Sequence, residues 1–398
     1  MRFWYNKMSM TSPRKILHIV SSWENGAGNE LAAFAPHLAQ AGFESEICVL
    51  AGTNNRNVPN VPTTTLGLRW TFDINTYLGV GRVLRRFRPD IVHAWDSTAH
   101  CYAAFHYGTG RILAEKRETD APKGFLQRHF DQKTHRFIVP RQNNALPIAK
   151  TVVIPPAAIP VLHSEPIATE ELLTKLGCSQ EVPSGEYYPV FLPQYEPARW
   201  NYKPASPRQT PFLIGVVLPL CLEHRILDAL WVFETLNHVH LNYHAFIIGE
   251  GKNREIFLRY RDRWNLFSRV HFLGNRHDTH RFLPRFDALL HLSSSAEYAG
   301  SILSAMSCGV PVVALATPES CEYILEGTTG NLIPDNGDFR FYRRTAVKRL
   351  LYLLENEELR RSMQIAAKDR IAKKFNFDAA VQRRIGVYRE LMVSNQEQ

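Results

Sequence analysis

The chain has 398 residues, of which 45% are hydrophobic and 21% are charged, and its formal net charge is +9. This composition is typical of a folded globular protein and excludes the disordered and fibrous classes. Because one hydrophobic core rarely serves a chain of this length, we expect two α/β domains. The longest apolar runs, such as Ile214 to Leu220, are far shorter than the ~20 residues of a membrane-spanning helix. The positive charge favours anionic partners, namely nucleotide phosphates, an anionic lipid surface or nucleic acid.

The first residues and the cysteines bear on the cellular location. Met1 to Pro13 is basic and aromatic, and the apolar stretch Ile16 to Val20 is shorter than the hydrophobic region of a signal peptide. We interpret Met1 to Pro13 as an extension before the first strand; a disordered tail, or a true start at Met8 or Met10, is the alternative. The cysteines lack the paired spacing of a zinc site or a redox dithiol, which predicts buried thiols in a reducing cytoplasm. They are Cys48, Cys101, Cys178, Cys221, Cys308 and Cys321.

The first part of the chain alternates between apolar runs and helical patterns. Lys15 to Val20 predicts a strand, a glycine-containing loop follows, Glu30 to Gln40 predicts a helix, and Glu46 to Leu50 predicts a second strand. This is a βαβ unit of the parallel, doubly wound kind. Residues 1–160 are therefore predicted to form a Rossmann-like domain. Its further strands are expected at Ile91 to Ala94, Ile112 to Ala114, Arg136 to Val139 and Thr151 to Ile154.

Residues 161–210 are rich in proline and aromatic residues, and only Thr169 to Leu176 has a helical pattern. We interpret this segment as a linker with an insertion, since a long segment without regular structure is usually functional or mobile. A second alternation fills residues 211–376, which predicts another parallel sheet. Thr345 to Leu391 is amphipathic and predicts helices outside the core. The strands are expected at Phe212 to Leu218, His244 to Ile248, Val270 to Leu273, Ala288 to Leu292, Val312 to Ala314 and Gly330 to Ile333.

Four local patterns in the second domain narrow the fold further. Phe246 to Gly251 reads FIIGEG, Arg269 to Gly274 reads RVHFLG, Asp287 to Ser293 reads DALLHLS, and Ala305 to Ala314 reads AMSCGVPVVA. Together with Arg88 to Trp95, this succession resembles the family 4 retaining glycosyltransferases of the GT-B fold. The resemblance implies two Rossmann-like domains facing across a cleft, the first for the acceptor and the second for the donor. It also implies that a helix of about residues 377–398 crosses back onto the first domain.

The resemblance implies a site for each substrate. In such enzymes the donor's diphosphate lies at a helix N-terminus, where free backbone N–H groups and the helix dipole favour negative charge. That helix is expected to begin near Ala299 to Ser301, and Gly26, Ala27 and Gly28 are expected to form the acceptor-side loop. The expected donor-binding residues are His224, Gly249, Gly251, Tyr298, Ala299, Gly300, Ser301, Ser304 and Glu322.

Several donor-site positions depart from the family pattern. Pro219 stands where the family has an arginine, and His224 where it has a lysine. Ser304 stands at the second glutamate and Ala296 at the first, with Glu297 one residue out of register. A charge-assisted contact contributes about 1.5–3 kcal/mol, so losing both cations would weaken donor binding by roughly two to four decades. Ser304 could still bond a ribose hydroxyl as a neutral partner.

Three residues are candidates for catalysis. Asp96 and His100 follow a predicted strand and are expected at the edge of the sheet where ligands bind; the alternative is a pair of solvated polar side chains. Glu297 is expected to face the sugar, and its alternative is a solvated loop acid. Trp95 occupies a position where many relatives have a histidine, so no general base is assigned there. The glycine pairs 26 and 28, and 249 and 251, either let a ligand approach the backbone or shape tight turns.

We therefore expect transfer of a sugar, a hexose, from a nucleotide-diphosphate sugar to an acceptor hydroxyl with retention, in polysaccharide, lipopolysaccharide or glycolipid synthesis. The alternative is a catalytically inactive relative that binds or scaffolds a partner. The chain has no Asp-X-Asp triplet, so neither a metal nor another cofactor is expected. Dispersed basic residues argue against nucleic acid.

The expected partners are a nucleotide sugar and a saccharide or lipid-linked acceptor. A basic set in the C-terminal helices is either a solvated face or a contact with an anionic membrane, at its inner face. The set consists of Arg360, Arg361, Lys368, Arg370, Lys373 and Lys374.

Overall fold

The computed structural model describes residues 14–23, 26–52, 58–68, 73–106, 111–115, 131, 133–139, 150–154, 157–159, 166–169, 171, 210–239, 242–276 and 278–393, without the side chains of Glu297 and Val393. The predicted N-terminal extension, most of the predicted helix at Thr169 to Leu176 and the aromatic insertion lie outside these residues. The chain divides into two compact units, residues 1–156 with 377–398, and residues 157–376. The acceptor and donor roles given to the two domains stay predictions.

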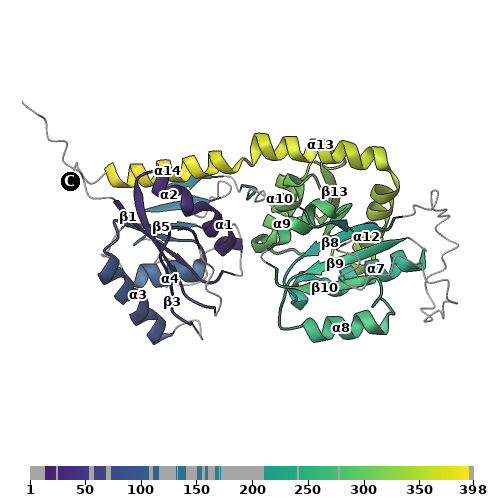
Figure 1. Ribbon diagram of the computed structural model, residues 1–398, viewed down its shortest axis with the longest axis horizontal. Helices are drawn as coiled ribbons and strands as arrows, with labels where there is room; N and C mark the ends of the chain where they lie inside the picture. Colours follow the sequence, from purple (N-terminus) through teal and green to yellow (C-terminus); the bar gives the residue numbers. More distant parts are fainter. Residues whose placement is uncertain are drawn as a thin grey trace, which may run out of the picture. The chain divides into compact units, whose positions relative to one another are not determined.

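The first unit is built on a parallel sheet with the order β3-β2-β1-β4-β5-β6-β7 (Figure 1). The strand order reverses between β1 and β4, which is the switch point where open α/β sheets bind ligands. The strands are β1 (Arg14–Val20), β2 (Phe43–Val49), β3 (Thr63–Thr65), β4 (Ile91–Ala94), β5 (Arg111–Glu115), β6 (Arg136–Val139) and β7 (Thr151–Val153). The helices are α1 (Gly26–Phe34), α2 (Pro36–Gln40), α3 (Ile74–Phe87), α4 (Ser97–Phe105) and α14 (Phe377–Val393).

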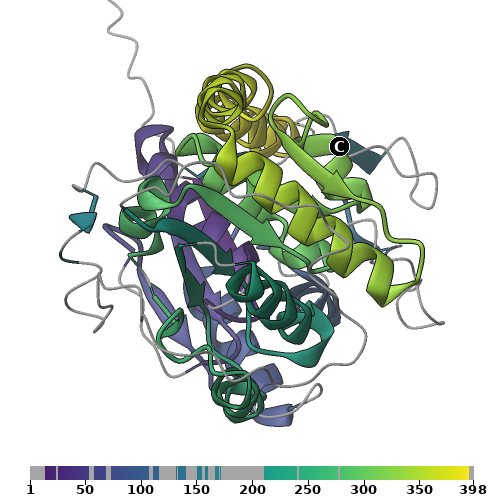
Figure 2. The same ribbon diagram turned by 90° about the vertical axis from the view of Figure 1, so that its right-hand side faces the viewer.

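The second unit has a parallel sheet with the order β10-β9-β8-β11-β12-β13, shown from two sides in Figures 1 and 2. Its strands are β8 (Phe212–Val217), β9 (Tyr243–Ile248), β10 (Val270–Gly274), β11 (Ala288–His291), β12 (Val312–Leu315) and β13 (Gly330–Ile333). Its α-helices are α7 (Ile226–His238), α8 (Arg254–Arg263), α9 (Thr279–Phe282), α10 (Gly300–Ser307), α11 (Pro318–Tyr323), α12 (Phe339–Glu355) and α13 (Glu357–Lys374). Short 3-10 turns are η3 (Leu222–His224), η4 (Leu283–Arg285) and η5 (Ala296–Tyr298).

Both faces of the second sheet are covered, as the near-continuous apolar strands require. One core cluster joins the sheet to α7 and α12, and includes Phe233 and Leu350. A second cluster joins the other face to α10 and α13, and includes Met306 and Ala367. The strands therefore have little contact with solvent except at their ends, which is where polar side chains gather.

The predicted strands are all present, with shifted ends. The three-residue strand β3 was not predicted, because three threonines carry no apolar signal. The predicted helix Glu30 to Gln40 begins earlier, at Gly26, and divides at Pro36, whose ring removes a helical hydrogen bond. Within the described residues, none of the helices combines the length and apolar character that crossing a membrane demands.

Candidate functional site

The carboxyl ends of β8 and β11 bring together a polar cluster in the second unit. These strands are neighbours in the sheet. His224 ends the turn that follows β8, and its Nδ1 lies 3.0 Å from Oγ of Ser293, just beyond β11. The backbone N–H of Ser295 also donates to this oxygen, at 3.1 Å. The ring of Tyr298 lies edge-on to the imidazole of His224, 4.6 Å between centroids.

A second histidine lies beside the first. His291 ends β11, and its Nδ1 lies 3.1 Å from Oγ of Ser301, in the first turn of α10. Ser301 also donates to the carbonyl oxygen of Tyr298, at 3.0 Å. Burial, with a smaller repulsion from His224, lowers the pKa of His291 to about 4. Burial also lowers the pKa of His224, against an attraction from Glu223.

The sequence identified three of the five side chains of this cluster. His224, Tyr298 and Ser301 were predicted site residues, and the structure brings them together. His291 and Ser293 were missed, although both are almost fully buried polar residues at the end of a predicted strand. Their position at the end of a strand could have identified them as site candidates, because ligands of open α/β sheets bind at the carboxyl ends of strands.

Helix α10 begins at Gly300, where the sequence placed it, and no side chain caps its N-terminus. The N–H of Ile302 donates to the carbonyl oxygen of Ala299, at 3.0 Å, which leaves the amides of Gly300 and Ser301 for an anion. Ala299, just before the helix, is 3% exposed and packs in the core, so only its backbone can meet a ligand. The hydroxyl of Ser304 donates to the carbonyl oxygen of Gly300 at 3.1 Å, one turn earlier. Its contact with a ribose stays a prediction.

The two glycines after β9 allow a close approach between backbones. Gly249 has φ +150°, and a Cβ there would lie 2.0 Å from the carbonyl oxygen of Leu218. A Cβ at Gly251 would lie 2.7 Å from the carbonyl oxygen of Leu220. Both glycines are explained by packing against the segment that leaves β8 and leads to His224. Their contact with the donor stays a prediction.

Of the two acidic candidates, only Glu322 has a side chain within the described structure. Glu297 lies in η5, between the described residues of the cluster, and its side chain is outside the described structure. Glu322 lies on α11, and its carboxylate is 3.4 Å from Nζ of Lys374 on α13. Glu322 is therefore engaged by a neighbouring helix, and its donor role stays a prediction.

The residues beside His224 supply no exposed fixed cation to the cluster. Pro219 follows β8 and carries no charge. Arg225 directs its guanidinium to Asp335, at 2.8 Å, and over the ring of Tyr342, 4.7 Å from the centroid. Arg199, a candidate to replace the missing charge, lies outside the described residues.

In the first unit, Asp96 and His100 have structural contacts. The carboxylate of Asp96 accepts from the N–H of Ala99 at 2.9 Å, which caps α4, and from the N–H of Ser21 at 2.8 Å. His100 was expected beside Asp96 at the ligand-binding edge, but it is fully buried, because it lies on the face of α4 that packs on the sheet. Its Nε2 lies 2.7 Å from Oγ1 of Thr134. Catalytic roles for Asp96 and His100 stay predictions.

The predicted acceptor-side residues form the start of α1 rather than a loop. Gly26 is the first residue of this helix, and Ala27 is 4% exposed. A Cβ at Gly28 would lie 2.3 Å from the carbonyl oxygen of Ser22, so a larger residue would force α1 away from the turn after β1. Packing alone accounts for Gly28.

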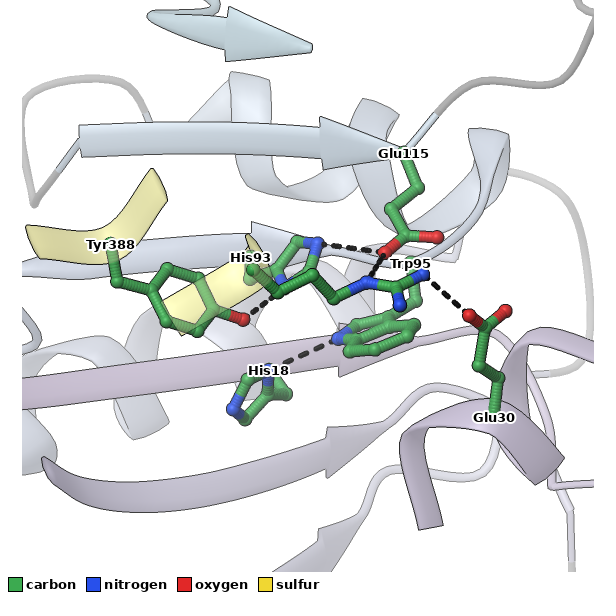
Figure 3. A network of polar contacts seen from close by, with 7 residues as sticks. His18, Glu30, His93, Trp95, Glu115 and Tyr388 are labelled. Atoms are coloured by element: carbon green, nitrogen blue, oxygen red, sulfur yellow. Dashed lines mark hydrogen bonds and ion pairs between the residues drawn. The ribbon is translucent and has the colours of Figure 1, made fainter. Parts of the chain in front are cut away.

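A buried polar network in the first unit was not predicted (Figure 3). Arg384 of α14 donates from Nε to Glu115, at 3.0 Å, and from a terminal nitrogen to Glu30, at 2.5 Å. Nδ1 of His93, on β4, lies 2.6 Å from the hydroxyl of Tyr388, also on α14. Burial alone would raise the pKa of Glu115, but Arg384 and His93 outweigh it and lower that pKa to about 2. The network fastens the last helix to β4, β5 and α1.

Trp95 extends this network. Its Nε1–H donates to Nδ1 of His18, at 3.0 Å, and the Arg384 guanidinium lies 5.3 Å from its ring centroid (Figure 3). Burial and the neighbouring His93 lower the pKa of His18 well below its usual value. The place where many relatives have a histidine is thus filled by a buried indole that supports the fold.

Residues 199–370 match the family described as glycosyl transferases group 1. This match falls within the second unit. N-acetyl-alpha-D-glucosaminyl L-malate synthase of Bacillus anthracis is 27% identical over 146 residues, 37% of this chain and 37% of that protein. Lipopolysaccharide glucosyltransferase WaaG of Escherichia coli (strain K12) is 28% identical over 102 residues, 26% of each chain. The chain thus matches about a third or less of the length of these curated relatives.

The fold is matched over a longer span. The crystal structure of Anabaena HepE in complex with UDP and glucose superposes with a TM-score of 0.72 at 16% identity, over 95% of this chain and 100% of that one. With two parallel-sheet α/β units, this likeness confirms the predicted GT-B fold. Among the described residues, no group of three or more His, Cys, Asp or Glu side chains is arranged to hold a metal ion.

Proposed function

We propose that this protein transfers a sugar, a hexose, from a nucleotide-diphosphate sugar to an acceptor hydroxyl with retention of configuration. The observation that carries the proposal is the glycosyl transferases group 1 domain at residues 199–370, whose sheet ends in the cluster of His224, His291 and Ser301. The N-terminus of α10 offers amides to the diphosphate, and two imidazoles flank it. HepE binds UDP and glucose on a similar fold, which supports a nucleotide sugar as the donor.

The rival function is an inactive transferase relative that binds a partner. Pro219, His224, Ala296 and Ser304 support it, because together they replace two cations and two carboxylates of the family pattern. A protein that binds a nucleotide sugar without turning it over is an inactive relative. A protein that turns the nucleotide sugar over is an enzyme.

A binding measurement tests the donor site directly. Purified full-length protein is titrated by calorimetry with the glucose and N-acetylglucosamine derivatives of UDP, and with GDP, ADP and TDP sugars. We expect one nucleotide to bind, and Glu297→Ala to weaken it by about tenfold or more, the size of one lost hydrogen bond to a charged group. The matched control is Glu319→Ala, in the first turn of α11. Absence of binding by every nucleotide sugar at millimolar concentration would contradict the proposal.

We further propose that the acceptor is a saccharide or lipid-linked saccharide reached at the inner face of an anionic membrane. The C-terminal basic residues are poor candidates for membrane contact, because five of the six bond to the protein itself. Arg360 is buried against backbone carbonyls, Arg370 donates to the carbonyls of Glu322 and Tyr323, and Arg361, Lys373 and Lys374 pair with Glu357, Asp369 and Glu322.

Helix α3 fits a membrane surface better. Ile74 and Leu78 are 71% and 51% exposed, and Tyr77 beside them is 36% exposed. Arg82 and Arg85 continue the same exposed face, and neither forms an ion pair or hydrogen bond within the described part of the chain. An apolar half that inserts and a basic half that meets anionic headgroups are the features of an interfacial helix.

A further inference from the structure

Two imidazoles at the carboxyl edge of the second sheet are each held by a serine. Nδ1 of His224 lies 3.0 Å from Oγ of Ser293, and Nδ1 of His291 lies 3.1 Å from Oγ of Ser301. The serines fix the ring positions, because each of them has a second bond to the backbone at Ser295 or Tyr298. In both rings, therefore, Nδ1 forms the hydrogen bond that holds the imidazole in place.

The other nitrogen of His224 is available to a ligand. Within the described residues, Nε2 of His224 has no hydrogen-bond partner, and it is not among the polar atoms that are buried without one. The side chain as a whole is only 8% exposed, so Nε2 lies in a largely buried setting. The ring packs against Tyr298, two residues before α10 begins, so a ligand at the N-terminus of α10 would lie near His224.

Burial lowers the pKa of His224 in the free protein, and the attraction from Glu223 opposes this shift only in part. Glu223, on the same turn, is mostly exposed and pairs with Lys252 at 3.2 Å. His291, the other imidazole of the cluster, has its pKa lowered to about 4 by burial, so it is neutral near pH 7. Arg225 is turned to Asp335, and Tyr298 packs against the ring through its edge. No described carboxylate contacts the imidazole, and burial, which lowers its pKa, favours the neutral form in the free protein.

A bound diphosphate shifts the equilibrium of His224 from the neutral to the protonated form. Its negative charge, brought within reach of the imidazole in a site of low solvent exposure, favours the imidazolium. A fixed lysine at the same position would carry its proton before and after binding. A histidine must take one up from solvent.

We infer that His224 is the cation of the donor site, and that nucleotide-sugar binding is coupled to uptake of one proton at its Nε2. The inference rests on the proposed function, since it names the group that neutralises the donor's diphosphate. Donor affinity therefore rises as pH falls, by up to about tenfold per pH unit between the pKa values of the free and the bound protein. Above that range the site binds its donor weakly.

Substituting lysine tests the inference by gain of function. His224→Lys supplies a permanent charge, so its affinity for the donor is expected to be about tenfold higher than wild type at pH 8 and nearly independent of pH. His224→Gln keeps a neutral donor group and is expected to bind weakly at every pH. Ser293→Ala releases the ring and is expected to reduce the affinity gained at acidic pH. His238→Gln, which removes a histidine bonded to Glu234 on α7, is the matched control.

The measurement is calorimetric titration of the full-length protein with UDP-glucose and the other nucleotide sugars, between pH 5.5 and 8, in two buffers of different ionisation enthalpy. Nucleotide sugars are used because their phosphates exchange no proton in this range. Wild type and His238→Gln are expected to take up a proton, and His224→Lys and His224→Gln none.

Three results would count against the inference. Affinity independent of pH in wild type, or equal proton uptake by wild type and His224→Gln, would overturn it while leaving the proposed function standing. No binding of any nucleotide sugar by wild type and by His224→Lys, at every pH, would overturn the proposed donor and the inference with it.

Discussion

At the scale of single residues, Arg384 shows how a charge becomes part of a core. Its side chain is 4% exposed and lies between Glu30 and Glu115, which are 18% and 16% exposed. Two carboxylates stabilise the buried guanidinium, and the guanidinium in turn lowers the pKa of Glu115. Burial alone would lower the pKa of Arg384, but Glu115 and Glu30 raise it instead. These buried ion pairs are therefore stable only when Arg384, Glu30 and Glu115 are all present.

Arg384→Met should therefore destabilise the first unit strongly. Removing one member of a buried ion pair leaves an uncompensated charge, which costs about 3–5 kcal/mol. Urea unfolding of the full chain measures the change, with Arg383→Met, an exposed neighbour, as the matched control. The triple variant with Glu30→Gln and Glu115→Gln should regain much of the loss. A change below about 1 kcal/mol for Arg384→Met would show that the network does not hold α14 in place.

The sequence predicted site residues at positions that match the family pattern, and missed residues whose role depends on distant contacts. His224 and Ser301 were singled out through the resemblance to the family. Arg384 was not, because its partners lie 269 and 354 residues away along the chain. Glycines 28, 249 and 251 carried an ambiguous signal, and the structure explains each by close backbone packing.

At the scale of elements, apolar runs identified the strands because parallel strands are buried on both faces. The same rule fails for β3, a three-residue edge strand of threonines. It also fails where one helical pattern is divided, as Pro36 separates α1 from α2. The family resemblance implied that a helix begins near Ala299 to Ser301, and α10 begins at Gly300.

Helix α3 is expected to bind anionic membranes. Ile74→Ser with Leu78→Ser should abolish binding to vesicles of phosphatidylcholine and phosphatidylglycerol. Arg82→Glu or Arg85→Glu should each weaken it by about fivefold or more, because each basic residue near such a surface contributes about 1 kcal/mol. Vesicle sedimentation at low and high salt gives the measurement. Ile365→Ser, which removes an apolar side chain that is 72% exposed on α13, is the matched control.

The same vesicle experiment tests whether α3 or the C-terminal helices contact the membrane. Lys373→Glu on α13 should leave binding unchanged, because Lys373 already pairs with Asp369 at 2.7 Å. Wild-type binding that is equal on vesicles of phosphatidylcholine alone would contradict electrostatic docking. Loss of binding with Lys373→Glu, but not with Arg82→Glu, would place the contact on the C-terminal helices instead.

At the scale of the whole molecule, the chain combines a GT-B fold with an edge of the second sheet that carries two buried histidines, His224 and His291. The two parallel sheets follow from the alternation of strands and helices. Activity does not follow from them, because one fold serves active and inactive relatives alike. The central claim is therefore chemical: the imidazoles and helix amides at this edge suffice to break the bond between sugar and diphosphate.

Turnover tests that claim most directly. The full-length protein is incubated with nucleotide sugars labelled with ¹³C at the anomeric carbon, with and without simple alkyl glycosides as acceptors, at pH 6 and pH 8. The account predicts a new anomeric signal of retained configuration, formed faster at pH 6, and faster at pH 8 in His224→Lys than in wild type. An unchanged donor signal, under conditions where calorimetry shows the nucleotide sugar bound, would contradict the account and identify the protein as a binding relative.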